Sequence, residues 1–194
     1  MVAFVLAYQL LAAAPECNQG TTYDIRECWD KQDAAAAAAL ASTYSAVQAA
    51  FRERGLDIEP LAESQSAWTD ARDKTCSFEY EQYLPGTIAP QLGTECDVRM
   101  TQARTGRLDT VLKQKARPGE APVAPATDAE LNRIYRLYLE RLSKSQAASF
   151  AAAQAAWTSY RDKWCAIEGG SCLAMLTNER IAELEASWLG EPFW

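Results

Sequence analysis

The sequence contains no histidine, and so lacks the side chain that most often acts as a general base near neutral pH. The serine-hydrolase motif G-x-S-x-G and the zinc-protease motif H-E-x-x-H are missing as well. Ser171, in the segment GGSC, is interpreted as a turn residue because no base accompanies it. We therefore predict a protein that is not an enzyme, with no catalytic residues, no bound metal and no cofactor.

The sequence also has no cluster of lysine and arginine residues, and its formal net charge is −7. Binding to nucleic acid normally requires a basic surface, so we expect no nucleic-acid partner. An acidic protein suits a basic partner, although the same charge is equally compatible with an ordinary soluble surface.

Glycine is scarce, with nine residues, and β-branched residues are few, whereas alanine occurs in runs at residues 34–39 and 151–153. This composition favours helices over sheets. No segment has a clear strand pattern, so we predict an all-α fold.

Residues 2–14 form an uncharged, apolar run that ends in three alanines before Pro15. The run resembles the hydrophobic part and cleavage region of a secretory signal, but no Lys or Arg precedes it. We interpret residues 1–14 as the remnant of a signal peptide, with a buried helix as the alternative. The run is too short to span a bilayer, and no other segment is expected to do so. We therefore predict no stable membrane insertion after removal of the signal.

Six cysteines follow this run: Cys17, Cys28, Cys76, Cys96, Cys165 and Cys172. An even number of cysteines behind an export signal predicts disulfide bonds in an oxidising compartment, here the periplasm or the extracellular space. Zinc binding is the alternative, and it is disfavoured because the sequence has neither histidine nor a C-x-x-C pair.

One phrase occurs twice in the chain. QSAWTDARDKTC at residues 65–76 returns as QAAWTSYRDKWC at residues 154–165, with eight of twelve positions identical. Each copy is followed by a second shared frame, C-x4-T-x2-R-x3-L. This frame contains Cys96, Thr101 and Arg104 in the first half, and Cys172, Thr177 and Arg180 in the second.

Between the two halves, residues 113–126 contain three prolines, which predict an extended linker. We therefore predict two tandem helical domains, at residues 15–112 and 127–194. Each is expected to contain a long antiparallel pair of helices and a shorter closing helix, held by disulfides.

Local signals divide these helices further. The turn signal GLDIEP at residues 55–60 separates the first two helices of the first half. Residues 143–149 are a weak point, where the first helix of the second half either continues or breaks. Thr101 and Thr177 are each predicted to cap the start of a closing helix.

The repeat also bears on the disulfide pairing. If the halves are equivalent, Cys76–Cys96 corresponds to Cys165–Cys172, which leaves Cys17 to pair with Cys28. The alternative joins Cys17 or Cys28 to Cys76 or Cys96, because antiparallel helices would bring those ends together.

On a helix, the Gln, Trp, Arg and Cys of the repeated phrase fall on one face. They are Gln65, Trp68, Arg72 and Cys76 in the first half, and Gln154, Trp157, Arg161 and Cys165 in the second. We expect each tryptophan to be buried against a neighbouring helix, with its arginine stacked on the indole or paired with a carboxylate. The stripe is interpreted as a structural joint, and the alternative is an exposed Arg and Asp pair that binds a partner.

The second half contains four motifs in order. D-x-x-L-N-x-x-Y holds Leu131, Asn132 and Tyr135, and it is followed by Q-x-x-W-x-x-x-R-x-x-x-C, a Gly-Ser loop with a second cysteine, and T-x-x-R-x-x-x-L. This series resembles the N-terminal domain of the LprI-like lysozyme inhibitors, a secreted helical bacterial family. The first half has the second and fourth motifs and a leading cysteine pair, but its first motif is degraded to DAAAAAALASTY.

The resemblance implies a periplasmic or secreted protein that binds and blocks a basic lysozyme, a target to which an acidic surface is suited. The short segment between Cys165 and Cys172 lacks one region that could contact such a partner. The alternative is a non-catalytic structural or adaptor protein of the cell envelope, with another basic envelope protein as its partner.

Overall fold

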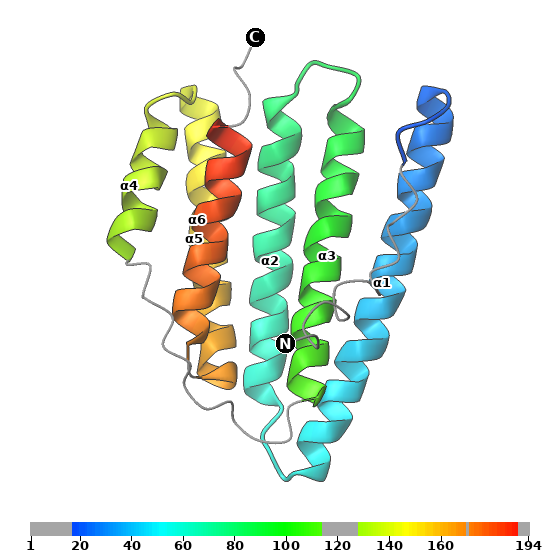
Figure 1. The fold of residues 1–194 in the computed structure, drawn as a ribbon, viewed down its shortest axis with the longest axis vertical. Helices are drawn as coiled ribbons and strands as arrows, with labels where there is room; N and C mark the ends of the chain where they lie inside the picture. Colours follow the sequence, from blue (N-terminus) through cyan, green and yellow to red (C-terminus); the bar gives the residue numbers. More distant parts are fainter. Residues whose placement is uncertain (1–16, 114–127, 170, 190–194) are drawn as a thin grey trace, which may run out of the picture.

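The computed structural model describes residues 17–113, 128–169 and 171–189. The predicted signal remnant and nearly all of the proline-rich linker lie outside these residues. The described part of the chain forms six helices and no strand, which confirms the all-α fold (Figure 1). The helices are α1 (Thr22–Glu53), α2 (Glu59–Gln82), α3 (Ala89–Lys113), α4 (Asp128–Leu139), α5 (Lys144–Glu168) and α6 (Cys172–Leu189).

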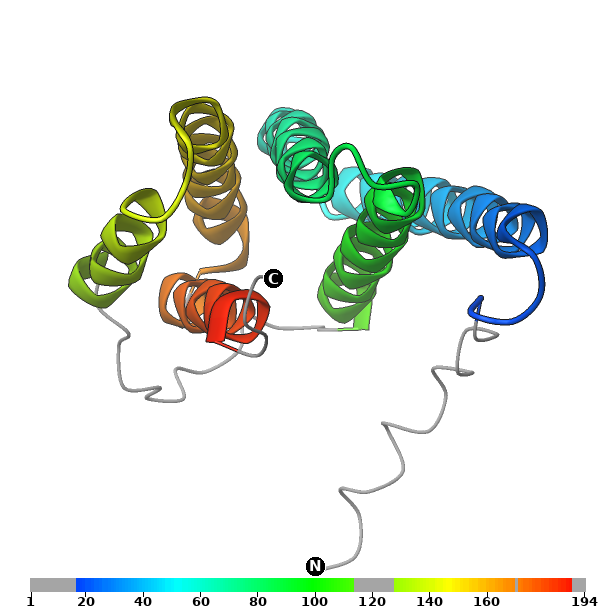
Figure 2. The ribbon, with the colours of Figure 1, turned by 90° about the horizontal axis from the view of Figure 1, so that it is seen from above.

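The central helices α2 and α5 come from different halves and pack against each other in antiparallel orientation. Lys163 near the end of α5 pairs with Glu63 near the start of α2, at 2.6 Å. At the other end, Gln146 donates to Gln82 across 3.4 Å. Seen from above, α3 and α6 lie on one side of this central pair, while α1 and α4 lie on the outside (Figure 2). The halves are therefore arranged like the two subunits of an antiparallel dimer.

One cluster of buried side chains spans both halves. Phe150 of α5 is fully buried, and its ring centre lies 5.1 Å from that of Phe78 in α2. The Tyr138 ring of α4 also stacks on Phe150, at 4.7 Å. Aromatic pairs of this kind add about 0.5–1.5 kcal/mol to the stabilisation from buried area. The contact between the halves is thus part of the hydrophobic core.

The three disulfides are Cys17–Cys28, Cys76–Cys96 and Cys165–Cys172. This is the pairing expected if the two halves are equivalent, and the crossed alternative does not occur. Cys76–Cys96 joins α2 to α3, and Cys165–Cys172 joins α5 to α6 at the corresponding place.

The prediction that Thr101 and Thr177 cap helices is wrong, because both residues lie inside helices and are buried. Helix α3 already begins at Ala89 and has 25 residues, so it is not shorter than the 24-residue α2. In the second half α6 begins at Cys172. The second cysteine of each half is therefore part of the closing helix, and the threonines face the core from its interior.

The weak point in the second half is a break between α4 and α5. Ser143 accepts a hydrogen bond from the backbone N–H of Gln146, whose side chain accepts in return from the Ser143 N–H. This reciprocal pair satisfies two N–H groups that the start of a helix leaves free. Helix α4 has only 12 residues as a result, so it is shorter than the long helix expected there.

Helix α1 is long and apolar enough to cross a membrane by length and composition, and no other described helix meets this test. Its most apolar stretch has a mean hydropathy of 1.2. On the sequence alone we expect no segment after residues 2–14 to be a candidate for a membrane span, but by length and composition this alanine-rich helix is one. In the structure α1 packs along α3 and buries Leu40, Val47 and Phe51.

Candidate binding surface

The repeated phrase forms the same contacts in both halves. Trp68 and Trp157 are buried, with 2% and 6% of their surfaces exposed. The guanidinium of Arg72 lies 5.1 Å from the centre of the Trp68 ring, and that of Arg161 lies 5.4 Å from the Trp157 ring. Each tryptophan is thus covered by the arginine one turn further along its helix.

The glutamines of the phrase hold the arginines of the second frame. Arg104 Nε donates to Gln65 Oε1 across 3.0 Å, and Arg180 Nε donates to Gln154 Oε1 across 3.2 Å. These bonds join α2 to α3 and α5 to α6. The four residues therefore fix the closing helix against the central helix in both halves.

The first motif of the second half contacts the same joint. Arg161 donates to Asp128 at the start of α4 and to the buried hydroxyl of Thr177 in α6, at 2.7 and 3.1 Å. Leu131 is buried, and Tyr135 stacks against Phe150. Asn132 is exposed, so this motif residue faces solvent.

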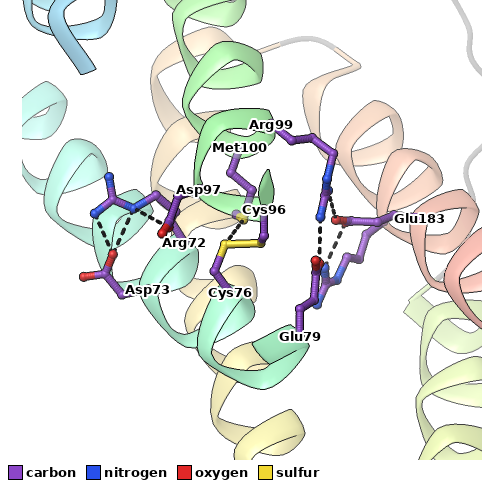
Figure 3. The surroundings of a disulfide bond; sticks show 10 residues. Arg72, Asp73, Cys76, Glu79, Cys96, Asp97, Arg99, Met100 and Glu183 are labelled. Carbon is purple, nitrogen blue, oxygen red and sulfur yellow. Dashed lines mark hydrogen bonds and ion pairs between the residues drawn. A yellow bond between two sulfur atoms is a disulfide. The ribbon is translucent and has the colours of Figure 1, made fainter. Parts of the chain in front are cut away.

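Arg72 is the motif arginine with the more open position. Its side chain is 27% exposed and pairs with Asp73 at 2.6 Å and with Asp97 at 3.6 Å. Arg161 is only 8% exposed at its side chain. A partly exposed Arg72 and an exposed Asp73 therefore form an ion pair in the first half, beside the Cys76–Cys96 disulfide (Figure 3).

Arg104 is completely buried and forms no bond to a carboxylate within the described residues. Its hydrogen-bond partners are the polar side chains of Gln65, Ser64 and Tyr160, and its guanidinium lies 4.3 Å from the centre of the Trp164 ring. Burial lowers the pKa of Arg104, since it disfavours the charged form. This arginine is therefore part of the core.

Long charged side chains bridge α3 and α6 across a cavity of about 230 Å³, which is lined by both motif tryptophans. Arg99 of α3 binds Glu183 of α6 at 2.9 Å and Glu79 of α2 at 2.7 Å (Figure 3). Arg107, which lies further along α3, pairs with Glu179 of α6. The three arginines that line the cavity, Arg99, Arg107 and Arg180, each pair with a carboxylate.

The two carboxylates that pair with Arg99 have pKa values shifted in opposite directions. Burial is the largest influence on Glu79, and it raises the pKa of this group despite the opposing charge of Arg99. Burial also acts to raise the pKa of Glu183, but Arg180 and Arg99 together outweigh it and hold that pKa below its ordinary value. Glu183 accepts hydrogen bonds from both Arg180 and Arg99, whereas Glu79 accepts one from Arg99 alone and is also repelled by the charge of Glu183.

The surface carries an acidic depression and an apolar loop. The depression lies between α2 and α5, has a volume of about 640 Å³ and is lined by Glu59, Glu63 and Asp70, with Lys163 paired to Glu63. The apolar loop joins α2 to α3 at residues 83–88, which we call the tip loop (Figure 1). All six of its residues are exposed.

The described residues include no group of three or more His, Cys, Asp or Glu side chains that could hold a metal ion. The fold and surface thus define a disulfide-linked all-α protein of two related halves, with a buried repeated motif and an acidic exterior.

The chain belongs to the lysozyme inhibitor LprI family, whose model matches residues 13–108 and 124–184. This confirms the resemblance seen in the sequence motifs, and the two ranges are consistent with two tandem copies. No curated protein and no solved structure gave a significant match.

The burial of Trp68 and Trp157 follows from the sequence motifs, whereas the ion pairs between α3 and α6 do not. Arg99 and Glu183 are 84 residues apart, and neither belongs to a motif that is shared by the halves. The tip loop did leave a signal, namely the longer spacing from Cys76 to Cys96 in the first half than from Cys165 to Cys172 in the second.

Proposed function

We propose that this protein is an exported inhibitor that binds a basic, C-type lysozyme and blocks access to its substrate cleft. The observation that carries the proposal is membership of the lysozyme inhibitor LprI family across both halves of the chain. Inhibition of this kind requires binding alone, which agrees with the lack of a histidine base.

Charge supports the choice of a basic target. The net charge is −7, and three carboxylates line the depression between α2 and α5. Glu63 and Asp70 pair there with Lys163 and Lys74, which leaves Glu59 as the lining carboxylate outside these pairs. Complementary charges accelerate encounter and orient the partners more than they raise affinity. We therefore expect the rate of association with lysozyme to fall as ionic strength rises.

The test is a turbidity assay with bacterial cell walls, purified C-type lysozyme and the purified, oxidised protein. Lysis should slow as the protein is added and should stop at micromolar excess. The same protein after reduction and alkylation is the control, because loss of three disulfides should unfold it and abolish inhibition. Lysozyme activity that is unchanged by micromolar oxidised protein would contradict the proposal.

Export to the periplasm or beyond is part of the same proposal. It is supported by the apolar run at residues 2–14 and by the three disulfides, which persist in oxidising compartments. Mass spectrometry of a non-reducing digest of protein taken from cells should recover all three cystine-linked peptides. Free thiols in the mature protein would contradict export.

A further inference from the structure

The tip loop concentrates apolar side chains that the fold leaves in solvent. Tyr83, Leu84 and Ile88 are 47%, 52% and 49% exposed. The other large exposed apolar side chains among the described residues are spread singly over distant elements: Tyr23, Leu56, Leu137 and Leu173. Scattered exposed residues are normal, but a cluster on one protruding loop marks a contact surface.

Backbone hydrogen bonds order the tip loop. The Gly86 N–H donates to the Tyr83 carbonyl at 2.7 Å, and the Ala89 N–H donates to the Gly86 carbonyl at 3.2 Å. A Cβ atom at Gly86 would lie 2.7 Å from the Tyr83 carbonyl oxygen, so a larger residue there would displace the backbone. The Cys76–Cys96 disulfide joins the two helices that carry the loop (Figure 3). A loop that is ordered before binding loses little conformational entropy on binding.

Charge is absent from the tip and present around its base. Residues 82–94 contain no charged side chain, and they are bounded by the partly exposed Glu81 and Glu95. Enzymes that hydrolyse glycosidic bonds carry two carboxyl groups inside the cleft. A carboxylate on the tip would be repelled there, whereas an uncharged apolar tip can enter the cleft while its acidic base faces the basic rim.

We propose that the tip loop inserts into the substrate cleft of the lysozyme and is the principal inhibitory contact of this protein. The second half contributes no equivalent loop, because only the segment AIEGGS separates Cys165 from Cys172. The two halves therefore differ in role: the first carries the contact, and the second supports it through α2 and α5. This inference rests on the proposed function.

The experiment compares the wild-type protein with Leu84→Ser, Ile88→Ser and the matched control Leu56→Ser in the turbidity assay. Leu56 is 49% exposed and precedes α2, whereas Leu84 is 52% exposed and follows it, so the control removes a similar side chain at the opposite end of that helix. Each tip substitution should raise the inhibition constant about tenfold or more, and Leu56→Ser should change it less than about twofold. Circular dichroism and thermal unfolding should be unchanged in all three variants, because none of these side chains is in the core.

A second measurement locates the contact on the enzyme. Binding of wild-type protein to lysozyme is measured with and without saturating tri-N-acetylchitotriose, a substrate fragment that occupies the cleft. The trisaccharide should weaken binding about tenfold or more if tip and sugar share one site.

The outcomes separate the two proposals. Inhibition that survives Leu84→Ser and Ile88→Ser would overturn the role of the tip loop and leave the inhibitor function intact. Binding that the trisaccharide does not weaken would overturn both the role of the tip loop and the blocking of the cleft, while inhibition itself would stand. A wild-type protein that does not inhibit would overturn the function itself, and the role of the tip loop with it.

Discussion

Arg104 and Arg180 occupy the same motif position in the two halves. Within the part of the chain that the structure describes, Arg180 pairs with a carboxylate, Glu183 at 2.9 Å, and Arg104 does not. A buried ion without a counter-ion costs free energy that an apolar side chain of similar size does not. Arg104→Met should therefore leave the free energy of unfolding unchanged or raise it by about 1–2 kcal/mol. Arg180→Met should lower it by about 1–3 kcal/mol, because Glu183 loses a charged partner.

Urea denaturation at pH 7 measures both variants. Equal destabilisation by the two substitutions would contradict the prediction. It would show that the bond from Arg104 to Gln65 and its stacking on Trp164 outweigh the cost of burying its charge.

Glu79 and Glu183 share Arg99 but should affect the pH dependence of stability with opposite signs. The lowered pKa of Glu183 means that its carboxylate stabilises the fold above the ordinary pKa of 4.5 and loses this effect as pH falls through the folded-state value. Glu183→Gln should therefore cost about 1–2 kcal/mol at pH 7 and progressively less below pH 4.5.

The matched variant is Glu79→Gln. Because the pKa of Glu79 is raised, its charged form is disfavoured by folding, and its removal should not destabilise the protein at pH 7. Denaturation of both variants at pH 3, 5 and 7 checks the signs. A loss of stability for Glu79→Gln at pH 7 equal to that for Glu183→Gln would refute this assignment.

At the scale of helices, the Cys76–Cys96 and Cys165–Cys172 disulfides close loops of different length. Their sequence separations are 20 and 7 residues. The entropy of loop closure then predicts a loss of about 3 kcal/mol on replacing both cysteines of the first bond by alanine, and of about 2 kcal/mol for the second. Urea denaturation of the two double variants tests the order, and a larger loss at Cys165–Cys172 would contradict it.

The same helices show what the sequence could predict. The repeated phrase located α2 and α5 because Gln, Trp, Arg and Cys at helical spacing leave a local pattern. The sequence alone leaves two disulfide pairings open, and the structure has the one in which the halves are equivalent. The start of α3 was misplaced at Thr101, although Pro90 is a signal for a first helical turn, where a missing N–H costs nothing. The ion pairs of Arg99 were not predictable, since they depend on how α3 and α6 come together across the two halves.

At the scale of the whole molecule, the two halves that the sequence divides into separate domains share one hydrophobic core. Phe150 of the second half is fully buried against Phe78 of the first, and α2 packs along α5 over its length. Neither half can expose this contact without losing apolar burial. We therefore expect the two halves to unfold together in one transition, as closely packed repeats do when their interface is part of the core.

Phe150→Ala tests this expectation, with Leu137→Ala as the control on the exposed side of α4. The core substitution should lower the free energy of unfolding by about 3–5 kcal/mol and should weaken hydrogen-exchange protection in α2 as much as in α5. Leu137, which is 44% exposed, should tolerate alanine with a change of about 0.5 kcal/mol or less. Unfolding followed by tryptophan fluorescence and by circular dichroism should coincide for the wild type and both variants. Two separate transitions, or protection lost in α5 and retained in α2, would show that the halves are independent domains joined by a weak interface.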